Sequence, residues 1–264
     1  MTAVATARPV GELLRGWREQ RRLSQLELAG AAEISTRHLS FVETNRARPS
    51  REMVVRLSEQ LDVPLRERNL LLLAAGYAPL YAERAIDAPH LAAAREAVRT
   101  ILRAHEPYPA VVIDRRWNLV DANESAGVFT AGIDPELLGP PLNVMRVSLH
   151  PRGLAPRIVN LAEWRAHLLD RLRRDVAHTA DPGLAALLDE IRAYPCDAPL
   201  SERDPAAPPE FAVPLRIRHD GRELSFVSVV ATFGTPLDVT VAELSIESFF
   251  PADEATGASL RRHA

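Results

Sequence analysis

Apolar residues near the start of the chain recur at the spacing of amphipathic helices. Four of them follow the i, i+3, i+4, i+7 pattern and predict one face of a first helix: Val10, Leu13, Leu14 and Trp17. The sequence SQLE at residues 24–27 has the order of a capping box, in which a serine and a glutamate satisfy each other's backbone N–H groups. The pattern therefore predicts a second helix that begins there.

A third predicted helix carries polar and basic residues on its outer face. Ser35 can cap its N terminus, and Asn45 can end it in the left-handed conformation. Leu39 and Val42 are three residues apart and should face the core. This placement turns the other residues of the helix outward: Thr36, Arg37, Ser40 and Phe41.

Two more helices complete the N-terminal pattern. One begins at Pro49-Ser50, and the other begins near Pro64 and ends at Gly76. Five short helices joined by tight turns, the third with an outward basic face, describe a helix-turn-helix module. We assign this domain to residues 1–76.

The pattern changes after Gly76. Residues 77–89 contain two prolines and predict a linker, and residues 90–105 then predict a helix. Short apolar runs at 110–114 and 119–122 predict two strands on either side of a turn. Polar Asn and Ser residues follow, which suits the start of another helix.

The rest of the chain supplies helices first and strands later. Apolar stripes predict helices at 161–177 and 183–194, and residues 194–210 are Pro-rich and acidic, as in a surface loop. Three late strands are predicted at 212–218, 224–232 and 240–249, with an Asp-Gly hairpin turn between the first two. The predicted fold class is α+β, with a five-stranded antiparallel sheet covered on one face by helices. We assign this second domain to residues 90–252 and a flexible tail to 253–264.

Charged residues are distributed unevenly between the two predicted domains. The protein has 264 residues and a formal net charge of −3, and all 32 of its Lys and Arg residues are Arg. Residues 1–70 hold 12 Arg against 9 acidic residues, whereas residues 71–264 hold 20 Arg against 26. A basic module on an acidic chain indicates that only the N-terminal domain contacts a polyanion.

Several absences narrow the class of protein. No apolar run approaches the roughly eighteen residues that cross a bilayer, and no signal peptide is recognisable, so we expect a cytoplasmic protein without a membrane partner. The single Cys196 can form neither an internal disulfide nor a Cys-pair metal site. No catalytic motif is present, so we expect no enzyme activity. His150 and His167 are weak evidence for metal or haem, and we expect no cofactor.

Residues 23–63, LSQLELAGAAEISTRHLSFVETNRARPSREMVVRLSEQLDV, resemble the DNA-binding domain of the Cro/C1-type (XRE) repressors. The resemblance implies that residues 24–31 form the first helix of the motif and residues 35–43 the recognition helix. It places Gln25 where the family contacts phosphate or a base. Glu43 is expected to pair with a nearby Arg instead. The candidate residues for binding double-stranded operator DNA, by a homodimer, are Gln25, Thr36, Arg37, His38, Ser40, Phe41, Asn45, Arg46 and Arg48.

Residues 87–252 resemble the ligand-binding domain of MmyB-like transcription regulators, a PAS-like fold behind an XRE module. The segments NVMRVSLHPRGLAPRIVNLAEWRAHLLDRLRRD and FGTPLDVTVAELSIESFFPAD carry much of this resemblance. It implies a small apolar ligand such as a fatty acid, held between sheet and helices. Met145 could add to an apolar lining, and Arg165 could hold a carboxylate. The main candidates are Trp117, Asn143, Arg146, His150, Arg157, Asn160, Trp164, His167, Phe226 and Phe233.

Two alternatives remain open. Some helix-turn-helix modules contact proteins rather than DNA. The second domain could dimerise or bind a partner protein without any small ligand. The aromatic candidates could also be ordinary core residues, and the arginines could be solvated or capping residues.

Overall fold

The structure, a computed structural model, describes residues 8–196, 212–234, 236 and 238–262. Apart from the short segments 177–179 and 237–239, the chain divides into two compact units between Glu83 and Arg84, within the predicted linker over 77–89. No helix among the described residues is long and apolar enough to cross a membrane. Each unit has a hydrophobic core of its own.

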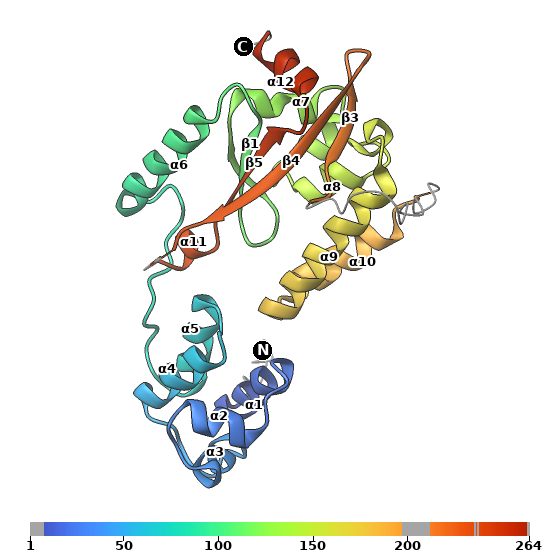
Figure 1. Ribbon diagram of the computed structural model, residues 1–264. Coiled ribbons are helices and arrows are strands. Elements are labelled where there is room, and N and C mark those ends of the chain that lie inside the picture. The colour runs from blue at the N-terminus through green and yellow to red at the C-terminus, as the bar shows by residue number, and fades with distance from the viewer. Residues whose placement is uncertain (1–7, 197–211, 235, 237, 263–264) are drawn as a thin grey trace, which may run out of the picture. The chain divides into compact units, whose positions relative to one another are not determined.

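The first unit is a bundle of five helices, as the pattern predicts (Figure 1). They are α1 (Val10–Gln20), α2 (Gln25–Ala31), α3 (Thr36–Glu43), α4 (Arg51–Gln60) and α5 (Leu65–Ala74). Their apolar faces meet in one core that includes Leu14, Trp17, Leu28, Leu39 and Leu57.

Serine side chains cap the start of α2, α3 and α4. Ser24 and Glu27 form the predicted capping box at α2, and Ser35 caps α3 through the backbone N–H of His38. Asn45 adopts the left-handed conformation, with a φ of 56°. The backbone N–H groups of Asn45 and Arg46 then bond to carbonyl groups in the last turn of α3, which closes the helix as a Schellman motif.

The second unit is built on a five-stranded antiparallel sheet (Figure 1). Its strands are β1 (Ala110–Ile113), β2 (Leu119–Ala122), β3 (Leu215–His219), β4 (Arg222–Thr232) and β5 (Ser245–Pro251). Their order across the sheet is β2-β1-β5-β4-β3. Asp220 and Gly221 both have positive φ at the β3–β4 hairpin, so the Asp-Gly turn prediction is confirmed.

Helices pack on both faces of the sheet rather than on one. The main core lies between the sheet and a set of helices that includes α8 (Val144–Leu149), α9 (Leu161–Thr179) and α10 (Pro182–Ala193). Helix α6 (Ala92–Ala104) packs on the opposite face, where Val98 and Leu102 meet β1 and β5. Because the side chains of a strand alternate, Val111 faces the main core and Val112 faces α6. The prediction of one covered face is therefore too simple.

Short helical elements make most of the remaining connections. They are η1 (Pro89–Leu91), η2 (Glu124–Ala126), α7 (Gly127–Thr130), η3 (Pro135–Leu138), η4 (Ala155–Arg157), α11 (Val239–Ala242) and α12 (Glu254–Arg261). Most of these elements span only three or four residues, so the apolar pattern does not mark them. The helix expected after the second strand corresponds to η2 and α7.

Two predictions near the C terminus are wrong. The strand predicted over 240–249 begins as the short helix α11, and β5 starts only at Ser245. The predicted tail instead forms α12, where Asp253 caps the helix and Thr256 is fully buried against Ser225 of β4. Residues 197–210 of the predicted Pro-rich loop lie outside the described residues.

Candidate functional site

Helix α3 presents basic and polar side chains on its outward face. Arg37 is exposed, and its guanidinium lies over the ring of Phe41 at 5.4 Å. Thr36, His38 and Ser40 are half-buried beside them. Arg46 is exposed in the loop that follows the helix. A cation and small polar groups on one helix face match the donors and acceptors of base edges in the major groove.

A buried ion pair fixes α3 to α1. Glu43, at the last turn of α3, accepts hydrogen bonds from Nε and Nη2 of Arg18 at 2.7 and 2.9 Å. The hydrogen bond with Glu43 raises the pKa of the Arg18 guanidinium above its usual value, although burial opposes the rise. Gln25 of α2 donates to the same carboxylate at 2.8 Å. Glu43 is thus the structural partner that the sequence analysis expected, and Gln25 helps to hold the motif together.

Asn45 and Arg48, two of the candidate DNA-binding residues, also make contacts within the first unit. The Asn45 side chain accepts a hydrogen bond from the backbone N–H of Gly11 in α1 at 3.1 Å. Arg48 donates to the carbonyl of Ala75 at the end of α5, at 2.9 Å from Nη2. Its guanidinium also lies over the ring of Tyr77. A cation at a helix C terminus stabilises the helix, so Arg48 has a structural role in this unit.

The second unit contains an apolar cavity of about 360 Å³ between the sheet and its helices. This volume lies in the range of small-molecule sites. Strands β1, β2, β3 and β5 form one wall, and α7, α8, α9 and neighbouring loops form the other. The apolar lining side chains include Val111, Phe129, Leu142, Met145, Leu168 and Phe249.

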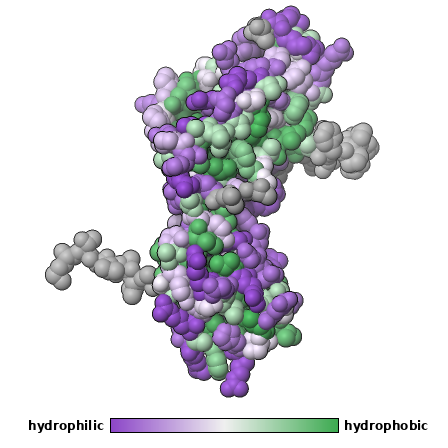
Figure 2. Space-filling view, turned by 90° about the vertical axis from the view of Figure 1, so that its left-hand side faces the viewer, coloured by the Kyte–Doolittle hydropathy of each residue, from purple (hydrophilic) through white to green (hydrophobic). Residues whose placement is uncertain are grey.

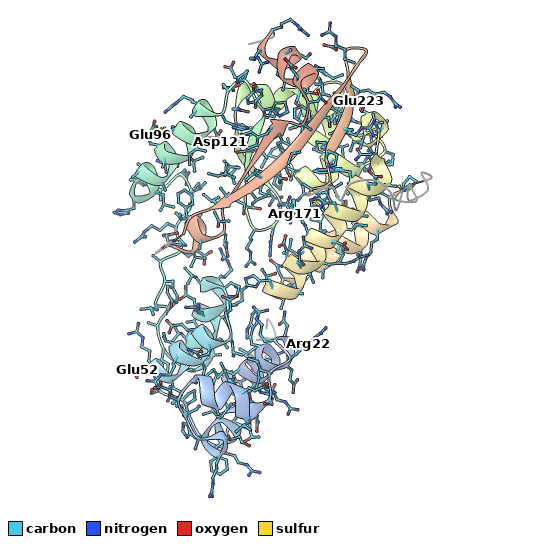
Figure 3. The ribbon with its side chains drawn as sticks, in the orientation of Figure 1. Arg22, Glu52, Glu96, Asp121, Arg171 and Glu223 are labelled. Atoms are coloured by element: carbon cyan, nitrogen blue, oxygen red, sulfur yellow. The ribbon has the colours of Figure 1, made fainter. Side chains whose placement is uncertain are left out.

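One buried charge pair lies at the wall of this cavity. Glu247 of β5 lines the cavity and is only 4% exposed. Arg171 of α9 donates a hydrogen bond from Nη1 to Oε1 of Glu247 at 2.9 Å. Figure 3 shows Arg171 between α9 and the sheet. Arg171 also lies over the ring of Trp117 at 4.5 Å, and Trp117 Nε1 donates to Asp175 at 3.0 Å. These contacts hold the Trp117 ring in place.

The structure brings only some of the predicted ligand residues to the cavity. Trp117 and Trp164 line it, and so does Met145. Trp164 is held in position because its Nε1 donates to the hydroxyl of Ser148 at 3.1 Å. The other predicted residues contact different parts of the unit.

The three arginines considered for a ligand carboxylate are engaged elsewhere. Arg146 donates two hydrogen bonds to Glu190 at 2.8 and 2.7 Å. Arg157 donates to the carbonyl of Ala131 at 2.7 Å, and burial lowers its pKa. Arg165 donates to carbonyl groups at the end of α10. No arginine among the described residues lines the cavity, contrary to the expectation from sequence.

The Arg146 pair extends to an aromatic side chain. The hydrogen bond from Arg146 lowers the pKa of the Glu190 carboxyl, although burial opposes the shift. Tyr194 donates a hydrogen bond to the same carboxylate at 2.5 Å. Burial, and then this hydrogen bond, raise the pKa of Tyr194 to about 12. The cluster of Arg146, Glu190 and Tyr194 thus connects α8 to the end of α10.

The two histidines lie near the cavity without lining it. His150 packs edge-on against Tyr194, with ring centroids 4.9 Å apart. His167 stacks on Trp164 at 5.4 Å. Burial, and then the nearby Arg171, lower the pKa of the His167 imidazole. Both rings support neighbouring aromatic side chains.

The remaining predicted residues have structural contacts. Asn143 caps α8 through its side chain, and Asn160 donates to the carbonyl of Pro214 at 2.8 Å. Phe226 is completely buried in the main core. Phe233 packs with the cluster under α6, on the opposite face of the sheet. None of these four side chains lines the cavity.

Two lining residues, which β5 contributes, were not among the residues predicted from the sequence. Glu247 and Phe249 are two residues apart, so they point to the same face of the sheet and both line the cavity. Ile246 and Phe249, two apolar residues of this strand, point to opposite faces of the sheet. Correct alternation from Phe249 would have identified Glu247 as an acidic residue on a buried face.

Comparison with known families agrees with this architecture. The model of the MmyB-like transcription regulator ligand binding domain matches residues 94–262, more than half of the chain. A helix-turn-helix family matches residues 14–68. Comparison with curated proteins gives no match. The two matches define a DNA-binding transcription regulator with a ligand-binding domain. The chain belongs to the MmyB-like family of such regulators, with an XRE-type helix-turn-helix at its N terminus.

Proposed function

We propose that this protein binds specific operator DNA through α3 and changes its DNA affinity when an apolar or amphipathic molecule enters the cavity of the second unit. The observation that carries the proposal is the presence of both parts in one chain. One unit has an exposed cationic helix face. The other has an apolar cavity of about 360 Å³ in a family of ligand-binding domains.

Arg37 is the proposed base-reading residue. It is exposed near the N terminus of α3, the part of a recognition helix that reaches base edges. Its planar guanidinium suits bidentate bonding to a guanine. The ion pair between Arg18 and Glu43 supports this role because it fixes the helix that carries Arg37. Arg46 is proposed to contact phosphate.

The proposed ligand has an acyl chain. The lining side chains are mainly aliphatic and aromatic, so an extended hydrocarbon body would find contacts along the cavity. A fatty acid or an acyl derivative, as the family resemblance implies, has such a body. Coupling between this ligand and DNA must be reciprocal, so DNA would change the ligand affinity by the same factor.

The proposed DNA-binding form is a homodimer. One small module contacts few base pairs, whereas two-fold operators match two-fold proteins. Sedimentation of the protein with and without operator DNA would test this part of the proposal.

A selection of bound sequences from random DNA tests the base-reading role. We expect wild type to enrich one motif, and Arg37→Ala to lose about 1–3 kcal/mol of affinity for it and to relax one base position. Arg99→Ala, which removes the same charge from an exposed residue of α6, is the control. Equal weakening of operator and random DNA by Arg37→Ala would contradict the proposal.

One observation favours a second candidate function, in which the second unit dimerises or binds a protein. Val229 of β4 and Phe250 of β5 are 52% and 43% exposed on the sheet face that also carries α6. Figure 2 shows apolar side chains gathered on the visible side of this unit. Exposed apolar patches are common at protein interfaces. If no acyl compound binds the protein, this candidate is favoured.

A further inference from the structure

The cavity has a single ionisable lining residue among the described residues, and it is an acid. Glu247 is 4% exposed, and the other lining side chains are apolar or neutral. Its Oε1 accepts the hydrogen bond from Arg171 at 2.9 Å. Among the described residues, no group donates a hydrogen bond to its second oxygen, Oε2. A buried carboxylate with an unused acceptor is a ready partner for a hydrogen-bond donor.

The positive partner of Glu247 is not part of the cavity lining. Arg171 is held between Glu247 and the ring of Trp117, where it lies 4.5 Å from the ring centroid. A bound molecule would therefore contact the carboxylate of Glu247, not the guanidinium of Arg171. The three arginines that could have received a carboxylate are bonded elsewhere.

We propose that the cavity selects a long-chain hydrocarbon compound whose head group is an uncharged hydrogen-bond donor, an alcohol hydroxyl or a primary amide, and that this donor binds Glu247 Oε2. The inference rests on the proposed function, because it names the ligand class of the same cavity. A free fatty acid would place a second carboxylate beside Glu247, where like charges repel strongly in a weakly polar environment. A hydroxyl or amide N–H instead satisfies the buried acceptor.

A matched ligand series tests the selection on the full-length protein. Dodecanol, dodecanamide, laurate and methyl laurate are titrated at neutral pH below their aggregation concentrations. Tryptophan fluorescence reports binding, because Trp117 and Trp164 both line the cavity. We expect dodecanol and dodecanamide to bind at least about tenfold more tightly than laurate, in line with a hydrogen bond to a charged group. Methyl laurate, which has no donor, should also bind more weakly than they do.

A substitution at Glu247 tests whether this residue causes the preference for dodecanol over laurate. Glu247→Gln keeps the size of the side chain and removes its charge, so laurate should gain affinity and the preference for dodecanol should shrink to less than about threefold. Glu223→Gln is the control: Glu223 is a half-exposed residue of β4 that pairs with Arg216 (Figure 3). It should keep the wild-type order of affinities.

The outcomes separate this inference from the function on which it rests. If laurate binds wild type as tightly as dodecanol, or if Glu247→Gln leaves the preference unchanged, the cavity still binds acyl chains and the head-group inference is overturned. If none of the four compounds binds wild type, the proposed ligand function fails as well. The comparison on wild type alone decides the preference even if Glu247→Gln does not fold.

Discussion

Arg18 of α1 and Glu43 of α3 form a two-point ion pair in the core of the helix-turn-helix unit, with N–O distances of 2.7 and 2.9 Å. The Glu43 side chain is 1% exposed and that of Arg18 is 11% exposed. The pair joins the first helix of the chain to the last turn of the helix that carries Arg37. The geometry of the proposed DNA-binding surface therefore depends on the Arg18–Glu43 pair, whose side chains lie in the core.

Glu43→Gln should destabilise this unit by about 2–3 kcal/mol, because it leaves the buried Arg18 without its counter-charge. Urea denaturation of the full-length protein, followed by hydrogen exchange of the α1–α5 amides, measures the change. Glu12→Gln, at an exposed position of α1, is the control and should stay within about 0.5 kcal/mol of wild type. Equal stability of the two variants would show that the pair contributes little.

Two glycines of α1 should respond to the same substitution in opposite ways. A Cβ on Gly11 would lie 2.2 Å from the carbonyl oxygen of Val42, whereas a Cβ on Gly16 would meet nothing within 4 Å. We expect Gly11→Ala to cost at least about 1 kcal/mol through the clash. Gly16→Ala should stabilise the helix by about 0.5–1 kcal/mol. Thermal denaturation of both variants checks the sign, and stabilisation by Gly11→Ala would mean that the two helices are not so close.

Substitutions of Arg46 and Arg48 should have different effects, because Arg46 is the proposed phosphate contact and Arg48 holds the end of α5. Arg46→Ala should weaken binding to all DNA sequences and reduce the slope of affinity against salt by about one. Arg48→Ala should mainly lower stability, by about 1 kcal/mol, because it removes the cation that bonds to the end of α5. Binding titrations across a salt series, paired with denaturation, measure both effects. An equal change of salt slope in the two variants would contradict the division.

The ion pair between Glu190 and Arg146 should make the stability of the second unit depend on pH in the acid range. The Arg146 hydrogen bond lowers the folded pKa of Glu190 below its unfolded value near 4.5. The stabilisation is therefore present above that pH and is lost as pH falls through the folded pKa. Glu190→Gln should be less stable than wild type at neutral pH, and the gap should close in acid. Urea midpoints from about pH 7 to about pH 3 test this, with the exposed Asp189→Asn as control. A gap that stays constant would exclude the linkage.

Helix periodicity and capping chemistry predicted the N-terminal unit well. Ser24, Ser35 and Ser50 each cap the helix they were expected to begin, because a cap depends on residues three positions apart. The roles of Gln25, Asn45 and Arg48 were harder to predict. Each bonds to a residue between 18 and 34 positions away in the sequence, and no local pattern encodes such a contact.

The cavity residues show even more clearly that contacts between distant residues are hard to predict from sequence. Trp117, Met145 and Trp164 were predicted because large apolar residues near a predicted sheet are natural lining residues. The polar candidates were chosen by type, and the fold engaged them in ion pairs and caps instead. Glu247 was missed because the alternation of β5 was not followed from Phe249, in a strand that begins five residues later than predicted. Side-chain partners across a sheet require the register, which a single sequence specifies poorly.

Native mass spectrometry of the purified full-length protein, before and after denaturation, tests the central claim that the cavity holds a small apolar or amphipathic molecule. The account predicts one copy of an acyl compound per chain, retained under native conditions and released on denaturation. Added dodecanol should give the same occupancy if the protein is purified without a ligand. A chain that carries no such molecule and gains none from long-chain alcohols, amides or acids would contradict the account.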